Sequence, residues 1–134
     1  MPIEVNFDGG KKVNAKINEF TIKTDQNIRS GGEGTAPEPF SLFLASLATC
    51  AGVYVQTFCD SRGIPVNNIT LDMDYNFNRE IKMVDHFDIT IHVPDNFPEK
   101  YESAVINAAS LCAVKRHLSD KITYAIHVVR QAGI

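Results

Sequence analysis

Three cysteines are the residues of this 134-residue sequence whose type and spacing suggest chemistry. Cys50, Cys59 and Cys112 are an odd number, placed too far apart for the disulfide framework of a small secreted protein. This usage favours a reducing compartment. A thiol becomes reactive when a nearby cation or a helix N-terminus lowers its pKa. Candidate cations are Arg29, in a glycine-rich loop, and the basic run 115–117 that follows Cys112.

The simplest alternative is that the cysteines only pack, because most cysteines on apolar helix stripes behave as small buried hydrophobes. A helix through residues 40–58 places Cys50 on one apolar stripe and Cys59 about half a turn away from it. Cys112 is predicted on the apolar stripe of a second helix. A Cys50–Cys112 disulfide therefore requires the two apolar faces to meet, with the Cα atoms within about 7 Å.

Metal and phosphate sites fit the sequence poorly. A zinc site would lack any C-x-x-C pair, and Cys112 and His117 would point about 140° apart on a continuous helix. The glycine-rich segment 31–34 is not followed by Gly-Lys-Ser/Thr, and its Glu33 would repel a phosphate. We therefore expect no metal and no cofactor.

Length and composition predict one domain over residues 1–134, with 44% hydrophobic and 22% charged residues. The net charge of -3 provides no basic footprint for a nucleic acid or an anionic membrane, so neither partner is expected. The N-terminal residues lack the basic stretch and apolar run of a secretory signal. Together with the cysteine usage, this predicts a cytoplasmic protein.

One apolar segment needs an explanation, because residues 40–58 carry no charge over nineteen residues, close to the length of a membrane span. A helix that is apolar all round is either a membrane span or the core helix of a soluble protein. The segment includes several serine and threonine residues, and the other elements are half-apolar and need a partner. We expect a core helix and no membrane.

Alternating apolar and polar residues predict three half-buried strands within the first 24 residues, with turns at 8–10 and at Asn18. The long helix is predicted to start near Pro39, because proline is tolerated in a first helical turn. It is predicted to end at Gly63, because glycine adopts the left-handed capping conformation.

The second half of the sequence predicts two further strands, a second helix and a last strand. The strands alternate over 69–77 and 87–93, the helix runs from 98 to 118, and the last strand covers 122–128. The order βββ-α-ββ-α-β, with strands in runs, indicates an α+β fold with antiparallel sheets around two central helices.

Two short motifs carry a family resemblance. The first motif begins with residues 32–40, which lead into the proline-led apolar helix. It continues through Leu42, Leu44, Ala45, Leu47 and Ala48 and ends at a cysteine within that helix, Cys50. The second is Cys112-Ala113-Val114, some sixty residues later. With the matching order of elements, the chain resembles a divergent member of the OsmC/Ohr family of thiol-dependent peroxidases over nearly its whole length.

The resemblance implies an intertwined homodimer that reduces organic hydroperoxides, with the central helices covered by strands of both chains. Cys50 matches the peroxidatic cysteine, whose thiolate attacks the O–O bond and becomes a sulfenic acid. Cys112 matches the resolving cysteine, which forms a disulfide with it. A dithiol reductant such as a lipoyl group would restore both thiols.

The resemblance also suggests residues around the cysteines. Phe40, Phe43 and Tyr54 would line an apolar substrate-binding pocket that favours alkyl hydroperoxides. The family's activating arginine is held by a glutamate after the helix-start proline, a position that Phe40 takes here. Glu38 and Arg29 are therefore the candidate activating pair.

Two alternatives stay open at this point. The missing helix-start glutamate is compatible with a non-catalytic or redox-sensing protein that binds an apolar ligand at the dimer interface. The other alternative is a dimer whose cysteines only pack.

Overall fold

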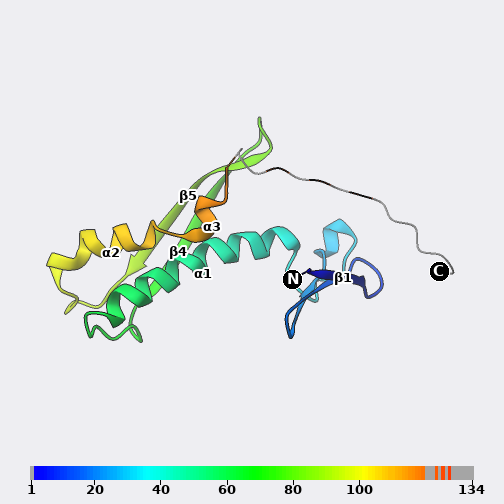
Figure 1. Ribbon diagram of the computed structural model, residues 1–134. Coiled ribbons are helices and arrows are strands. Elements are labelled where there is room, and N and C mark those ends of the chain that lie inside the picture. The colour runs from blue at the N-terminus through cyan, green and yellow to red at the C-terminus, as the bar shows by residue number, and fades with distance from the viewer. Residues whose placement is uncertain (1, 120–122, 124, 126, 128–134) are drawn as a thin grey trace. The chain divides into compact units, whose positions relative to one another are not determined.

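The computed structural model describes residues 2–119, 123, 125 and 127 (Figure 1). Their contacts divide the chain into two units. The first unit consists of Met1–Thr49 and Asp72–Thr90, and the second consists of Cys50–Leu71 and Ile91–Ile134. All three cysteines therefore belong to the second unit.

The first 24 residues form a three-stranded antiparallel sheet, as the alternating pattern predicts. Its strands β1 (Glu4–Phe7), β2 (Val13–Ile17) and β3 (Phe20–Thr24) pair in the order β1-β2-β3. At the second turn, Asn18 has a φ of 54°, a left-handed conformation that asparagine tolerates better than most residues. The three predicted strands and both turns are confirmed, but the predicted half-burial is wrong for β1, whose four residues are all exposed within the chain.

The long apolar segment forms one helix, α1 (Pro39–Asp60). It ends as predicted, since Gly63 has a φ of 67° and the Ile64 N–H donates to the Cys59 carbonyl oxygen, 2.9 Å away. By length and composition α1 could cross a membrane, with a mean hydropathy of 1.6. Its C-terminal half contributes Val55, Phe58 and Cys59 to the core of the second unit, but only 22% of its apolar window is buried within the chain, so the core helix stays a prediction.

Two long strands follow α1, β4 (Thr70–Asn78) and β5 (Met83–His92), and they pair with each other. The prediction of these two strands is confirmed. Apolar side chains alternate along them, but Tyr75 and Phe77 are more than half exposed. The apolar face of this hairpin is therefore only partly covered within one chain.

The predicted second helix is wrong in one respect, because it is not continuous. A 3-10 turn (Glu99–Tyr101) leads into α2 (Glu102–Ala109), and a separate short helix, α3 (Ala113–Arg116), follows (Figure 1). The Ser110 hydroxyl donates to the Asn107 carbonyl oxygen at 2.7 Å. Such a side-chain bond offers the backbone an alternative to the helical ladder, and the helix ends there.

The predicted last strand cannot be compared with the structure. Its four apolar residues lie outside the described residues: Ile122, Tyr124, Ile126 and Val128.

The core of the second unit forms where α1 meets the segment after β5. Its buried members are Val55, Phe58, Cys59, Phe97 and Val105. The ring of Tyr101 meets Phe58 edge to face, with centroids 5.8 Å apart. Burial of these side chains fixes which face of α1 is turned inward.

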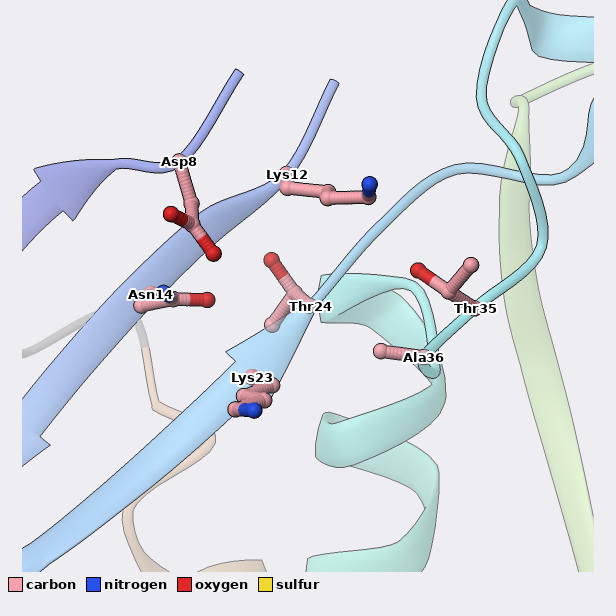
Figure 2. A pocket seen from close by; sticks show the side chains of 7 residues that line it. All are labelled: Asp8, Lys12, Asn14, Lys23, Thr24, Thr35 and Ala36. Carbon is pink, nitrogen blue, oxygen red and sulfur yellow. The ribbon is translucent and has the colours of Figure 1, made fainter. Parts of the chain in front are cut away.

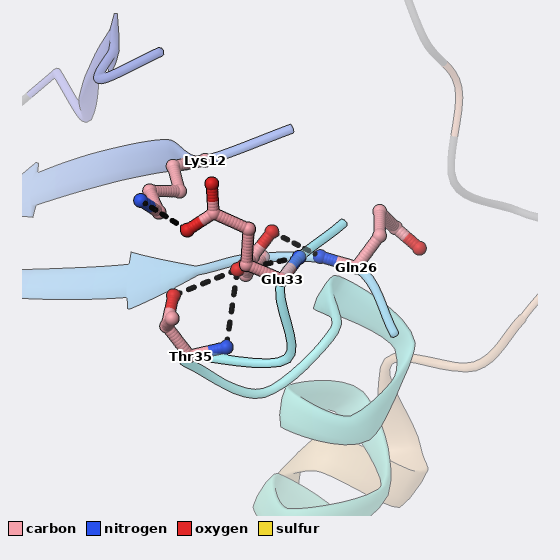
Figure 3. A network of polar contacts seen from close by, with 5 residues as sticks. Lys12, Gln26, Glu33 and Thr35 are labelled. Carbon is pink, nitrogen blue, oxygen red and sulfur yellow. Dashed lines mark hydrogen bonds and ion pairs between the residues drawn. The ribbon is translucent and has the colours of Figure 1, made fainter. Parts of the chain in front are cut away.

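In the first unit, the buried carboxylate of Asp25 organises the loop between β3 and α1 (Figure 3). Its Oδ1 accepts from the N–H of Gln26 at 2.7 Å. Its Oδ2 accepts from the Thr35 hydroxyl at 2.7 Å and from the N–H groups of Thr35 and Glu33 at 3.1 and 3.3 Å. These bonds, led by the Thr35 hydroxyl, lower the pKa of Asp25 to about 2. The long loop is therefore folded around one carboxylate.

This network predicts a pH dependence of stability. Asp25 has a lower pKa in the folded chain than its ordinary value of 3.8, so its stabilisation is complete above about pH 4 and is lost as the pH falls toward 2. In Asp25→Asn, the unfolding temperature should be lower at pH 7 and should fall less steeply than wild type between pH 4 and 2. Thermal unfolding followed by circular dichroism measures both curves. Exposed Asp74→Asn serves as control, and wild-type and Asp25→Asn curves that stay parallel across this window would contradict the prediction.

Candidate active site

Cys50 and Cys59 lie on the same helix in different environments. Cys50 is half-buried, whereas Cys59 is fully buried in the core cluster. The face of α1 that the chain's own core covers carries Leu47, Ala51, Val55 and Cys59. Cys50, on its own apolar stripe, is therefore only partly covered within the chain.

Cys112 lies at the break between α2 and α3 and not on a helical stripe. Its backbone is extended, with φ -48° and ψ 122°, and the residue is 3% exposed. The side chain of Cys112 forms a hydrogen bond with that of Cys50. The structure thus brings together the two predicted cysteines, both as thiols.

The break also directs backbone donors at the sulfur of Cys50. The first N–H groups of a helix have no partner within the helix. In α3, the N–H groups of Val114 and Ala113 bond to Cys50. A thiolate accepts such bonds more strongly than a thiol, so they favour the ionised form.

Hydrogen bonds and charge together make Cys50 the more acidic of the two cysteines on α1. The N–H of Val114 contributes most to lowering its pKa, followed by the Cys112 side chain, and then by the N–H of Ala113 and the charge of Arg116. Burial opposes them. For Cys59 the balance is reversed, since burial, with a smaller contribution from Asp60, raises its pKa. Cys50 therefore has the properties of a nucleophile and Cys59 those of a packed hydrophobe.

The two residues expected to activate the thiolate have other neighbours. Arg29 is exposed in the 3-10 turn Ile28–Ser30. Glu38 accepts a hydrogen bond from the Asn27 side-chain amide at 2.6 Å. Both residues belong to the first unit, whereas the described groups that act on Cys50 all belong to the second. Within the basic run that follows Cys112, Arg116 is the residue whose charge lowers the pKa of Cys50.

The residues expected to bind substrate are all on α1. Phe40 and Phe43 stack, with ring centroids 5.5 Å apart, and Phe40 is half exposed. Tyr54 lies one turn after Cys50 and is partly buried. No group of three His, Cys, Asp or Glu side chains suited to a metal occurs within the described part of the chain.

The charge of Arg116 leads to a test on the thiol itself. In Arg116→Ala the pKa of Cys50 should rise, so its alkylation by iodoacetamide should require a higher pH. The rate at neutral pH should fall, since a higher pKa leaves a smaller fraction of the thiol ionised. Rates for Cys50 are read from peptide masses at each pH. Lys115→Ala provides the control, and an unchanged profile in Arg116→Ala would refute the role of this charge.

Comparison with known protein families gives a match over most of the chain. The family model described as OsmC-like protein matches residues 32–127. No curated protein matched the sequence.

Several solved structures have a similar fold. A protein of Psychrobacter arcticus 273-4, proposed to be an osmotic stress induced and detoxification response protein, is 21% identical, with a TM-score of 0.75 and 88% of each chain covered. An organic hydroperoxide resistance protein OsmC of Legionella pneumophila is 17% identical, with a TM-score of 0.53 over 87% of this chain and 88% of the other. OhrB of Bacillus subtilis, an organic hydroperoxide resistance protein, is 16% identical, with a TM-score of 0.52 over 90% and 93%. At these identities the likeness supports the fold, which is α+β with antiparallel sheets.

Proposed function

Because this chain belongs to the OsmC-like protein family, we propose that it reduces organic hydroperoxides with Cys50 as peroxidatic and Cys112 as resolving cysteine. One observation carries the proposal: the Cys112 side chain and the N–H groups of Val114 and Ala113 all lower the pKa of Cys50. Two proteins of similar fold are organic hydroperoxide resistance proteins, which supports this class of substrate.

The proposed reaction has two steps on the protein. The Cys50 thiolate attacks one peroxide oxygen, the O–O bond breaks, and the leaving alkoxide takes a proton to become an alcohol. Cys50 is then a sulfenic acid. The Cys112 thiol attacks its sulfur, water leaves, and the disulfide forms.

The cycle closes when an external dithiol, such as a lipoyl group, exchanges with the Cys50–Cys112 disulfide. The dithiol is oxidised to its own disulfide, and both protein thiols are restored. No metal or cofactor takes part in these steps.

The surroundings of Cys50 suggest how each partner is recognised. Phe40, Phe43 and Tyr54 supply apolar surface for the alkyl group of the peroxide. Arg116 stabilises the thiolate by its charge. Arg29 with Glu38 would add a second activating charge during turnover.

A homodimer is part of the proposal, because one chain leaves much apolar surface exposed on its strands. Phe7 is 83% exposed and Phe20 70% exposed on the first sheet. A second copy would cover such faces and the open side of α1. We propose a single OsmC-like domain over residues 1–134 that acts as a dimer in the cytoplasm, and sedimentation equilibrium should give twice the chain mass.

A direct experiment tests the proposed reaction. The reduced protein is mixed with cumene hydroperoxide and dihydrolipoamide, and peroxide loss is followed together with peptide masses after quenching. We expect multiple turnovers and, without the dithiol, a Cys50–Cys112 disulfide with Cys59 unmodified. Three unmodified thiols after exposure to peroxide would refute the mechanism.

A second candidate function rests on the half-exposed stack of Phe40 and Phe43. A protein that binds an apolar ligand there without turnover, or that only senses redox state, would use the same surface. Native mass spectrometry distinguishes the two functions: retained ligand without peroxide loss favours binding, and turnover without retained ligand favours the peroxidase.

A further inference from the structure

The first unit contains a polar hollow of about 230 Å³ that the peroxidase proposal does not use (Figure 2). Its walls come from the first sheet and the loop before α1. All of its seven lining residues except Ala36 are polar or charged: Asp8, Lys12, Asn14, Lys23, Thr24, Thr35 and Ala36. Pockets for drug-sized apolar ligands are usually larger and mostly apolar, so this hollow suits a smaller, polar molecule.

Asn14 is a largely buried residue that presents its side-chain amide to the hollow. It lies on the central strand β2, is 9% exposed, and lines the hollow with its side chain (Figure 2). Its side-chain amide has no hydrogen-bond partner among the described residues. No solvent-shielded side-chain nitrogen or oxygen among the described residues lacks a partner, so the Asn14 amide faces the open space of the hollow, where a bound polar group can bond to it.

The two threonines present acceptor oxygens to the hollow. The Thr24 hydroxyl donates its proton to the Val13 carbonyl oxygen. The Thr35 hydroxyl donates its proton to Asp25. Each hydroxyl oxygen keeps lone pairs that accept from a ligand, so both favour a molecule that carries N–H or O–H groups.

Charges of both signs line the same hollow. The Asp8 N–H donates to the Lys12 carbonyl oxygen at 3.0 Å across the turn, and the side chains of both residues line the hollow. Lys23 adds a second ammonium group from β3. Glu33 forms an ion pair with Lys12 at 3.0 Å and so offsets one of these positive charges.

We propose that this hollow binds a small zwitterion of the free amino acid class. Its carboxylate would meet Lys23 and the Asn14 amide, and its ammonium group would meet Asp8 and the threonine oxygens. A dianion such as phosphate is disfavoured by Asp8, and a metal cation is disfavoured by the two lysines. The size of the hollow limits the ligand to the smaller polar amino acids.

Titration of the reduced full-length chain tests the proposal. The probes are glycine, L-serine, L-asparagine and L-glutamine, and binding is followed by the Asn14 side-chain amide signals in ¹⁵N-labelled protein. At least one probe should bind, and propionate and ethanolamine, which each lack one charge, should bind about tenfold more weakly or less. No shift with any probe at 10 mM, or equal binding of inorganic phosphate, would overturn the proposal.

Two variants separate a binding role from a structural one. Asn14→Leu should weaken the probe at least about tenfold and should keep or raise the unfolding temperature of the unliganded protein, because the lost amide had no partner. Lys23→Gln should weaken binding of the probe by a similar factor. Lys16→Gln, on the same strand but outside the hollow, should bind as wild type does.

Unchanged probe affinity in Asn14→Leu and Lys23→Gln would overturn the site. These outcomes do not depend on peroxide turnover, so they are independent of the proposed function.

Discussion

Replacing Cys50 with serine should slow the reduction of cumene hydroperoxide by about a thousandfold or more, because the thiolate is the group that attacks the peroxide. Serine keeps the shape of the side chain but is not ionised at neutral pH. The N–H groups of Ala113 and Val114 would still bond to the hydroxyl, so the local fold should persist. Peroxide loss with a dithiol reductant measures the effect. Undiminished turnover would remove Cys50 from the mechanism.

The other two cysteines provide the comparison. In Cys112→Ser the first step remains, so one equivalent of peroxide should be consumed and the Cys50 sulfenic acid should be trapped by dimedone. In Cys59→Ala activity per folded chain should stay near the wild-type value, because burial keeps this thiol un-ionised. A Cys59–Cys50 disulfide in wild type would contradict this assignment.

Replacing Phe97 with alanine should lower the free energy of unfolding by about 3–5 kcal/mol, the usual cost of emptying a buried phenylalanine site. Phe97 is 6% exposed and lies in the core cluster with Phe58 and Val105. The free energy of unfolding of small domains is about 5–15 kcal/mol in total, so a large part of it would be lost. Urea unfolding followed by circular dichroism measures the change.

The control changes the same residue type at the surface. Phe20, at the start of β3, is 70% exposed within the chain. At a protein concentration low enough to separate the proposed dimer, Phe20→Ala should cost less than about 1 kcal/mol. If both variants lost equal stability, the core would not be centred on Phe97.

Local sequence patterns were sufficient to predict most of the strands and helices. Alternation along β1 to β5 and the proline and glycine boundaries of α1 are properties of short segments. They do not depend on what a segment packs against, so the predicted strands and the long helix within the described residues are confirmed. The same patterns supported the family resemblance, which the family match bears out.

The break before α3 was not predictable in the same way. Residues 98–118 carry a helical apolar spacing, and Ser110 alone is a weak stop signal. Cys112 has non-helical backbone angles and a buried side chain, and the N–H groups of the next two residues have a partner outside their own helix. That partner is Cys50, which lies sixty-two residues earlier in the sequence.

The sequence by itself determined the strands and the long apolar helix, because residue types and short spacings encode these properties. Only the tertiary structure decided that Cys59 faces the core and that Cys50 is half-buried. It also decided that, among the described residues, the charge of Arg116 lowers the pKa of Cys50. The physical reason is that burial and electrostatic fields depend on distances between segments remote in sequence. Periodicity describes each helix alone and contains no information on which face another segment covers.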